Sequence, residues 1–227
     1  METFVLIHGA FGDNWSWHKV IPLLEKAGHR VIAPDLPGHG QNKKIATEDI
    51  TPQTYADCVV EVLDRQPEPV ILVGHSMGGM VISRAAEQRP DKIKKLVYVC
   101  AFLLGDGESL HSNGGGHHDP INAPYETFKE LFFGDCPDED VRQARARMVP
   151  EPKTMGGTPI HITEENYGRI PRVYIECLRD NAIPPATQKQ MYTEMPCERV
   201  MTMDTSHAPL FAAPEELARN LLSVIDV

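Results

Sequence analysis

Six short runs rich in Val, Ile and Leu recur along the chain, and they constrain its fold more than any other feature. Each run is almost continuously apolar, without the polar alternation of a half-exposed strand. Continuous apolar character is typical of strands that are covered on both faces, as in a parallel sheet. The runs begin at Phe4, Arg30, Val70, Lys95, Arg172 and Arg199.

Between these runs, the apolar residues take the three- and four-residue spacing of helices. This spacing occurs over residues 17–24, 55–63, 81–86 and 217–225. Strands that alternate with helices require right-handed crossover connections, which leave helices on both faces of the sheet. The sequence therefore predicts an α/β fold with a doubly wound, mostly parallel sheet of about six strands.

The interval between Leu103 and Arg169 interrupts the alternation. It holds glycines, prolines and two helical patterns, over residues 123–133 and 139–148, and it is too long for a plain crossover. We expect residues 1–227 to form one domain, with residues 104–168 inserted as a cap over the active site. Such a cap would lie at the carboxyl edge of the sheet, where ligands bind in folds of this kind.

Composition and charge exclude several classes of partner. The 227 residues are 41% hydrophobic, which suits one substantial core. The net charge is −10 and no basic block occurs, so nucleic acid is not an expected partner. No apolar stretch approaches the roughly 20 residues that cross a bilayer, and no signal segment precedes the first apolar run. We expect a soluble cytoplasmic protein without a membrane partner, of unassigned oligomeric state.

Cysteines and clustered histidines give no expectation of a metal or cofactor. The five cysteines are odd in number, widely spaced and never paired as C-x-x-C, which argues against a disulfide framework or a structural zinc site. His117 and His118 are adjacent in a glycine-rich stretch. Adjacent histidines lack the spacing that fixes tetrahedral metal geometry, so a loop of the cap is the favoured interpretation.

One serine stands where a buried strand is expected to turn into a helix. The segment Gly74-His75-Ser76-Met77-Gly78 matches the pattern G-x-S-x-G, with an apolar run before it and a helical pattern after it. Glycines on both sides would let a strained turn bring neighbouring backbone close without a clash of Cβ atoms. The sequence thus indicates Ser76 as a nucleophile.

A serine nucleophile needs a histidine base and a carboxylate that orients it. Of the ten histidines, only His207 follows the sixth apolar run and precedes the final helical pattern. Asp180 follows the fifth run and is the favoured acid. Asp106, after the fourth run, remains an alternative, and Asp204 remains another, although it better suits a role in stabilising the His207 loop.

The oxyanion of an acyl-transfer reaction needs two N–H donors. The helix expected to begin at Met77 would direct its free N–H groups toward the serine. The segment HGAFGD, residues 8–13, follows the first apolar run, and its glycines leave the backbone open enough to present the N–H of Ala10. We expect the N–H groups of Ala10 and Met77 to form the oxyanion hole.

Four segments in order resemble the α/β-hydrolase superfamily. More narrowly, they resemble the small lineage that contains plant methylesterases, hydroxynitrile lyases and bacterial pyrethroid-hydrolysing carboxylesterases. The segments are LIHGAFGDNWSWHKVIPLLEKAGHRVIAPDLPGHG, VGHSMGG, RVYIECLRDNAIPPATQKQM and SHAPLFAAPEEL. The resemblance implies a hydrolase fold without its first two strands. It also implies the roles already suggested for Ser76, Asp180, His207 and the two amides.

Two positions distinguish the branches of this lineage. Hydroxynitrile lyases of the group carry threonine at the position of Gly9 and lysine at the position of Ala208, where the lysine holds the charge of cyanide. Without that cation, ester hydrolysis is favoured over cyanohydrin cleavage. A hydroxynitrile lyase, a cofactor-free dioxygenase and a non-catalytic small-molecule receptor remain alternatives on the same fold.

Apolar residues of the cap and of the loop after the first run are candidates for the substrate pocket. Such walls favour small to medium uncharged esters, aryl or alkyl. Residues 126–133 fit equally well an amphipathic helix that packs on the core. The candidates are Phe11, Leu103, Phe128, Phe132 and Met148, with Leu104, Leu131 and Phe133 as further members.

Overall fold

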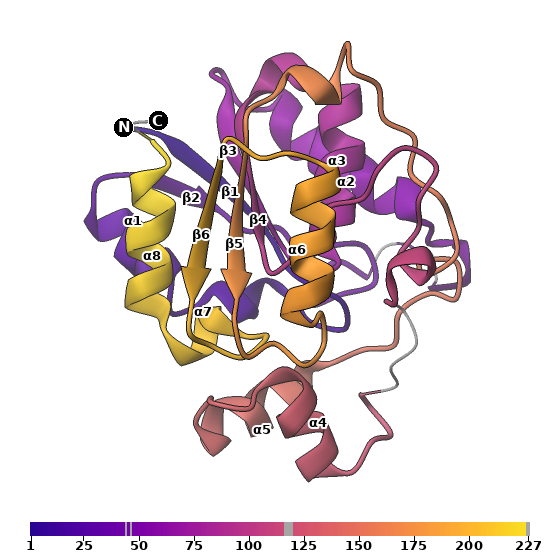
Figure 1. Ribbon diagram of the computed structural model, residues 1–227, viewed down its shortest axis with the longest axis vertical. Helices are drawn as coiled ribbons and strands as arrows, with labels where there is room; N and C mark the ends of the chain where they lie inside the picture. Colours follow the sequence, from indigo (N-terminus) through magenta and orange to yellow (C-terminus); the bar gives the residue numbers. More distant parts are fainter. Residues whose placement is uncertain (44, 46, 116–119, 226–227) are drawn as a thin grey trace.

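The computed structural model describes the whole chain except residues 44, 46, 116–119 and 226–227 (Figure 1). All six predicted strands form, and they make a single parallel sheet. The strands are β1 (Thr3–Ile7), β2 (Arg30–Ile32), β3 (Val70–His75), β4 (Ile93–Val99), β5 (Arg172–Cys177) and β6 (Arg199–Met203). The prediction of an α/β fold with about six parallel strands is therefore confirmed.

The strand order β2-β1-β3-β4-β5-β6 places a change of winding direction between β1 and β3. The chain moves to one side of β1 to form β2, and then returns to the other side to form β3. At such a point the loops that leave the two strands diverge and open a crevice at their carboxyl ends. The loop after β1 holds Ala10, and the turn after β3 holds Ser76.

Helices cover both faces of the sheet. They are α1 (Ile21–Lys26), α2 (Pro52–Asp64), α3 (Gly78–Gln88), α4 (Tyr125–Phe132), α5 (Asp138–Arg147), α6 (Pro185–Glu194), α7 (Pro209–Ala212) and α8 (Pro214–Ser223). α2, α3 and α6 contribute to one buried cluster, and α1, α7 and α8 contribute to a second one. Neighbouring strand residues divide between the clusters, Leu72 in the first and Ile71 in the second, because successive strand side chains point to opposite faces.

The segment from 104 to 168, called the insert below, connects β4 to β5 and contains α4 and α5. These two helices lie beyond the carboxyl ends of β5 and β6 (Figure 1). Phe128 of α4 and Val141 of α5 are fully buried in the second cluster. The two helical patterns predicted for this interval are confirmed to within two residues at each end. The adjacent histidines His117 and His118 lie outside the described residues.

No helix in the described part of the chain combines the length and the apolar character that a membrane span requires.

Candidate active site

Ser76 occupies the turn between β3 and α3 in a left-handed backbone conformation, with φ of 54°. Three hydrogen bonds hold this turn. The Ser76 N–H donates to the Val99 carbonyl at 3.3 Å, and the Ser76 carbonyl accepts from the N–H groups of Gly79 at 3.0 Å and Phe102 at 3.1 Å. Because a left-handed conformation is unfavourable for a residue with a side chain, these bonds are what keep the hydroxyl exposed at the sheet edge.

The flanking glycines are required by close backbone approaches. A Cβ atom at Gly74 would lie 2.6 Å from the Gly78 carbonyl oxygen, and one at Gly78 would lie 2.8 Å from the Ile7 carbonyl oxygen. Neither backbone contact has room for a methyl group. The G-x-S-x-G pattern thus lets α3 start directly against the ends of β1 and β3.

Ser76, His207 and Asp180 form a chain of hydrogen bonds. The Ser76 Oγ lies 2.9 Å from His207 Nε2, and His207 Nδ1 lies 2.7 Å from Asp180 Oδ2. The side chains come from the ends of β3, β5 and β6, which parallel pairing brings to one edge of the sheet. In this arrangement the imidazole can take the serine proton at Nε2 while its Nδ1–H donates to the carboxylate.

Asp180 is only 2% exposed, so its carboxylate depends on hydrogen-bond donors from the protein. Its Oδ1 accepts from the N–H groups of Ala182 and Ile183, both at 2.8 Å. Its Oδ2 accepts from Gln188 Nε2 at 3.2 Å in addition to His207. These donors fix the carboxylate in the orientation that meets the imidazole.

The two alternative acids make their contacts elsewhere. Asp106 has a side chain that is 62% exposed, and its Oδ1 accepts from the N–H of Ile162 at 3.1 Å. Asp204 pairs with Arg179, whose Nε lies 2.9 Å from Asp204 Oδ1. Asp180 is the carboxylate that contacts His207.

Ala10 and Met77 both line the cavity into which Ser76 opens. The loop that carries Ala10 lies directly against the serine turn, because a Cβ atom at Gly9 would lie 2.9 Å from Ser76 Cβ and 3.0 Å from His75 Nδ1. This close approach brings the loop that carries Ala10 next to the turn that carries Ser76 and Met77. The oxyanion hole formed by the Ala10 and Met77 N–H groups stays a prediction.

His8 and His75 are buried next to this machinery, and both act as neutral hydrogen-bonding groups. Burial, with a smaller contribution from the charge of His39, lowers the pKa of His8 to about 4. Burial, with a smaller contribution from the charge of His207, lowers the pKa of His75 to about 3. His75 Nε2 donates to the His207 carbonyl at 2.8 Å, which ties the histidine loop to the serine turn.

The comparison that decides the family covers almost the whole chain. A model described as "Alpha/beta hydrolase family" matches residues 4–220. The chain belongs to this family. Its resemblance to the α/β hydrolases in four ordered segments is thereby confirmed.

Individual relatives of this hydrolase are named as esterases. The putative chloroplastic methylesterase 11 of Arabidopsis thaliana is 34% identical over 99% of this chain, which spans 64% of that protein's length. The pyrethroid hydrolase of Sphingobium wenxiniae is 35% identical over 100% of this chain and 88% of its own length. The crystal structure of a pyrethroid hydrolase from Sphingobium faniae superposes with a TM-score of 0.87 at 32% identity, covering 100% of this chain and 98% of that one. These names support a hydrolase of carboxylic esters.

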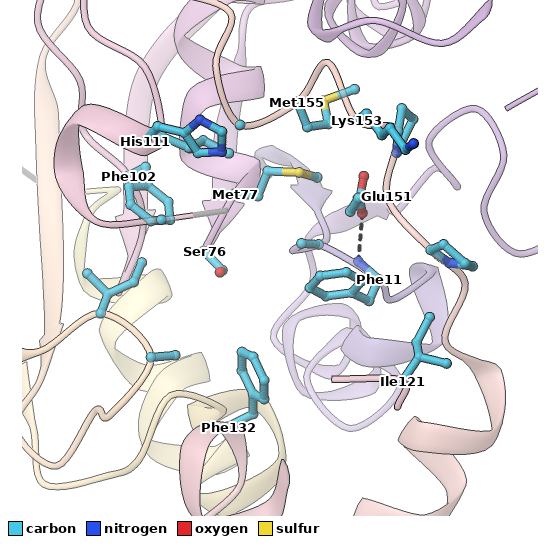
Figure 2. Close-up of a pocket in the computed structure, with 18 of the residues that line it drawn as sticks. Phe11, Ser76, Met77, Phe102, His111, Ile121, Phe132, Glu151, Lys153 and Met155 are labelled. Carbon is cyan, nitrogen blue, oxygen red and sulfur yellow. Dashed lines mark hydrogen bonds between the residues drawn. The ribbon is translucent and has the colours of Figure 1, made fainter. Parts of the chain in front are cut away.

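Two cavities of the hydrolase meet at Ser76 and His207. The larger has a volume of about 460 Å³ and the smaller of about 70 Å³. Ala10, Phe11 and Phe132 line both of them. Figure 2 shows the larger cavity, with the Ser76 hydroxyl pointing into the space between Phe102, Phe132 and Phe11.

The predicted pocket residues divide into wall and core. Phe11 and Phe132 line both cavities, and Met148 lines the smaller one. Leu103 and Phe128 are fully buried in the two core clusters and line neither of these two cavities. The neighbour Phe102 belongs to the first cluster as well, but it also lines the larger cavity, whereas Leu103 is fully buried.

Several wall residues were not predicted. Phe102 follows β4, and its place after a strand is a signal that could have found it. Trp15 lies in the loop after β1 and lines the smaller cavity. The insert contributes further wall residues from stretches without periodicity, where the sequence carries no local signal. These are Leu110, His111, Gly115, Ile121, Asn122, Pro150, Glu151, Pro152, Lys153, Met155 and Gly156.

Within the described residues, His75, Cys100 and His207 offer metal-ligating atoms within 4.8 Å of one another. Their atoms are already engaged inside the site. Both ring nitrogens of His207 contact triad partners, and the His75 and Cys100 side chains donate to the His207 carbonyl at 2.8 and 3.4 Å. The cluster fits the scaffold of the histidine loop better than a metal site.

The neutral histidines predict how stability depends on pH. Below pH 6.5 the unfolded chain binds protons at His8 and His75 that the folded protein, with pKa values of about 4 and 3, does not bind. The free energy of unfolding should therefore decrease as the pH is lowered below 6.5, by up to about 1.4 kcal/mol per pH unit for each histidine. The free energy of unfolding can be measured in urea between about pH 6 and pH 5. In His8→Asn, the slope of this free energy against pH should correspond to about one fewer proton bound on unfolding. The control His161→Asn, with a side chain that is 83% exposed, should leave it unchanged. Equal slopes for all three proteins would contradict the prediction.

The placement of Leu103 predicts a loss of stability without a loss of substrate binding. Leu103→Ala removes a fully buried side chain and should lower the free energy of unfolding by about 2–5 kcal/mol. The KM for p-nitrophenyl acetate should stay within about twofold. Met148→Ala is the matched change in the cavity wall, and it should alter KM at a smaller cost in stability. If Leu103→Ala raises KM and leaves the free energy of unfolding unchanged, the prediction is wrong and Leu103 lines the substrate pocket.

Proposed function

We propose that the chain is a serine carboxylesterase that hydrolyses small to medium uncharged, apolar esters, alkyl or aryl, through an acyl-enzyme. The observation that carries this proposal is the chain of contacts from Ser76 Oγ to His207 Nε2, at 2.9 Å, and from His207 Nδ1 to Asp180, at 2.7 Å. A serine hydroxyl becomes an effective nucleophile when a base at this distance accepts its proton.

In the first half of the reaction, Ser76 Oγ bonds to the ester carbonyl carbon while His207 Nε2 takes the serine proton. The carbonyl oxygen becomes an anion, which the N–H groups of Ala10 and Met77 stabilise. The imidazolium keeps its Nδ1–H on Asp180. When the tetrahedral intermediate collapses, the bond to the alcohol oxygen breaks and His207 gives that oxygen its proton.

The second half repeats these transfers with water. His207 Nε2 takes a proton from a water molecule, whose oxygen attacks the acyl carbonyl. Collapse of this second intermediate breaks the bond to Ser76 Oγ, which recovers its proton from His207 and releases the carboxylic acid. Every proton passes through residues of this chain, and the proposed mechanism includes no cofactor.

The unequal volumes of the two cavities favour ester substrates with one small and one larger side. The smaller cavity has room for about five water-sized groups, and the larger lies in the range of small-molecule sites. The walls of the smaller cavity are mainly apolar, which favours uncharged groups. They include Trp15, Phe133, Met148, Leu210 and Phe211. The relatives named methylesterase support the same division, since that name specifies an ester with one small side.

The insert has the role of a cap in this proposal. Phe132 of α4 borders both cavities, and its ring centroid lies 5.8 Å from that of His207. Leu110, Ile121 and Met155 extend the insert's contribution along the larger cavity. Substrate selection would thus fall mainly to the insert, while the sheet edge carries the reacting groups.

The structure favours hydrolysis over cyanohydrin cleavage at two positions. A threonine at position 9 would push its Cβ to 2.9 Å from Ser76 Cβ, and Ala208 offers no cation to a departing cyanide. The complete hydrogen-bonded triad likewise favours an enzyme over a non-catalytic receptor.

The role of Ser76 predicts the loss of turnover in Ser76→Ala. The rate of p-nitrophenyl acetate hydrolysis should fall by about 10⁴ to 10⁶, because the nucleophile is removed. Circular dichroism should show an unchanged fold. A fluorophosphonate probe should label the unsubstituted protein and the control Ser112→Ala, and it should not label Ser76→Ala. Turnover that survives in Ser76→Ala would remove this serine from the mechanism.

The two cavities predict an asymmetric tolerance for ester size. Lengthening one side of the ester from methyl to hexyl should change kcat/KM by less than about tenfold, whereas esters with two bulky sides should be hydrolysed slowly. Trp15→Ala enlarges the smaller cavity and should relax this limit. The panel includes a bulky pyrethroid-like ester and a half-ester of a dicarboxylic acid. Faster turnover of the charged half-ester than of its neutral diester would contradict an apolar site.

A further inference from the structure

Residues 8–13, called the oxyanion loop below, are hydrogen-bonded to residues of the insert. The Phe11 N–H donates to Glu151 Oε1 at 2.6 Å, and the Phe11 carbonyl accepts from the Val149 N–H at 3.0 Å. Figure 2 shows the first of these contacts at the wall of the larger cavity. Arg147 forms an ion pair with Asp13 at 2.8 Å. Three residues of the segment 147–151 therefore bind the loop that carries Ala10.

The carboxylate of Glu151 is itself anchored by buried side chains. Its Oε2 accepts from the Tyr55 hydroxyl at 2.8 Å, and its Oε1 lies 3.3 Å from His39 Nε2. His39 Nδ1 in turn donates to the Gly12 carbonyl at 2.6 Å. The Glu151 side chain is 10% exposed and that of His39 is 1% exposed. The network is thus a closed ring of contacts that begins and ends on the oxyanion loop.

We propose that Glu151 is a positioning residue of the esterase, which fixes the Ala10 N–H in the oxyanion hole by accepting the hydrogen bond of the neighbouring Phe11 N–H. Phe11 has a left-handed backbone with φ of 65°, which is unfavourable for an aromatic residue. The peptide plane between Ala10 and Phe11 therefore needs an external contact to stay in place, and a rotation of this plane about Ala10 would also disturb the adjoining Gly9–Ala10 peptide, which carries the Ala10 N–H. Glu151 supplies that contact, because its acceptor oxygen Oε1 lies 2.6 Å from the Phe11 nitrogen.

The carboxylate of Glu151 lies beside the imidazole of His39, with Oε1 at 3.3 Å from Nε2. Burial alone would lower the pKa of His39, but the hydrogen bond and the charge of Glu151 outweigh it and raise this pKa above its ordinary value. The Glu151 carboxylate thus stabilises the charged form of His39, and a positive charge on His39 would offset that of the carboxylate. The hydrogen bond, and not the negative charge, is the active element of the proposal.

Two variants separate the hydrogen bond from the charge. Glu151→Gln keeps an acceptor oxygen at the same reach without the charge, whereas Glu151→Asp keeps the charge and withdraws the oxygen by one methylene group. Loss of one oxyanion donor costs roughly 10² to 10³ in rate. A displaced donor should cost less, so kcat for p-nitrophenyl acetate should fall about tenfold to a hundredfold in Glu151→Asp, with KM within about threefold. Glu151→Gln should keep kcat within about threefold.

A trifluoromethyl ketone, which forms an oxyanion on Ser76, provides a second measurement. Its inhibition constant should rise in Glu151→Asp in parallel with the loss of kcat, and it should change little in Glu151→Gln. The control Glu126→Gln, at an exposed position of α4, should behave like the unsubstituted protein. Thermal unfolding of each variant confirms that the folded protein is being assayed.

Each other result overturns the proposal. Unchanged kcat in Glu151→Asp means that the loop does not need this contact. A larger loss in Glu151→Gln than in Glu151→Asp means that the charge acts and the hydrogen bond does not. A change in KM alone makes Glu151 a substrate contact. The inference depends on the proposed esterase function, which fails separately if Ser76→Ala retains turnover.

Discussion

The left-handed backbone of Ser76 is the constraint on which the rest of the site depends. Such a conformation costs of order 1–3 kcal/mol, and it persists only where the surroundings determine it. Here the determinants are the Val99 carbonyl and the Phe102 N–H from the end of β4, together with the first turn of α3. The strained backbone of Ser76 is therefore hydrogen-bonded to β4 and α3, which are themselves packed in the sheet and its helix layer. The packing of the fold thus holds the Ser76 hydroxyl next to His207.

The insert reaches both loops that meet the serine, and it uses a carboxylate in each case. Glu151 accepts from the Phe11 N–H on the oxyanion loop at 2.6 Å. Asp135 accepts from the Ser206 N–H at 2.9 Å, one residue before His207, and from Arg179 Nη2 at 3.0 Å, one residue before Asp180. A segment that is expected to select substrates therefore also constrains the reacting groups. Its sequence cannot vary freely at these two positions without consequences for the triad.

The strands and the triad candidates could be predicted from sequence because buried parallel strands are continuously apolar and each candidate follows one of them. α6 escaped prediction because its buried side chains are few, Gln188 and Met191 among ten residues. Residue type alone did not separate Leu103 in the core from Phe102 in the cavity wall. The contact between Phe11 and Glu151 joins positions 140 residues apart, and no local pattern encodes such a distance along the chain.

The triad side chains and the cavity walls that the insert contributes lie in different parts of the chain. Ser76, Asp180 and His207 follow the ends of β3, β5 and β6 and are joined by hydrogen bonds of 2.9 and 2.7 Å, so their geometry tolerates little change. Phe132 stands on the insert and separates the larger cavity from the smaller one. A different side chain at this boundary would redistribute volume between the two cavities while the sheet edge stayed intact. Under the proposed esterase function, the same triad would therefore serve esters of different shape, because Phe132 belongs to the insert and not to the triad.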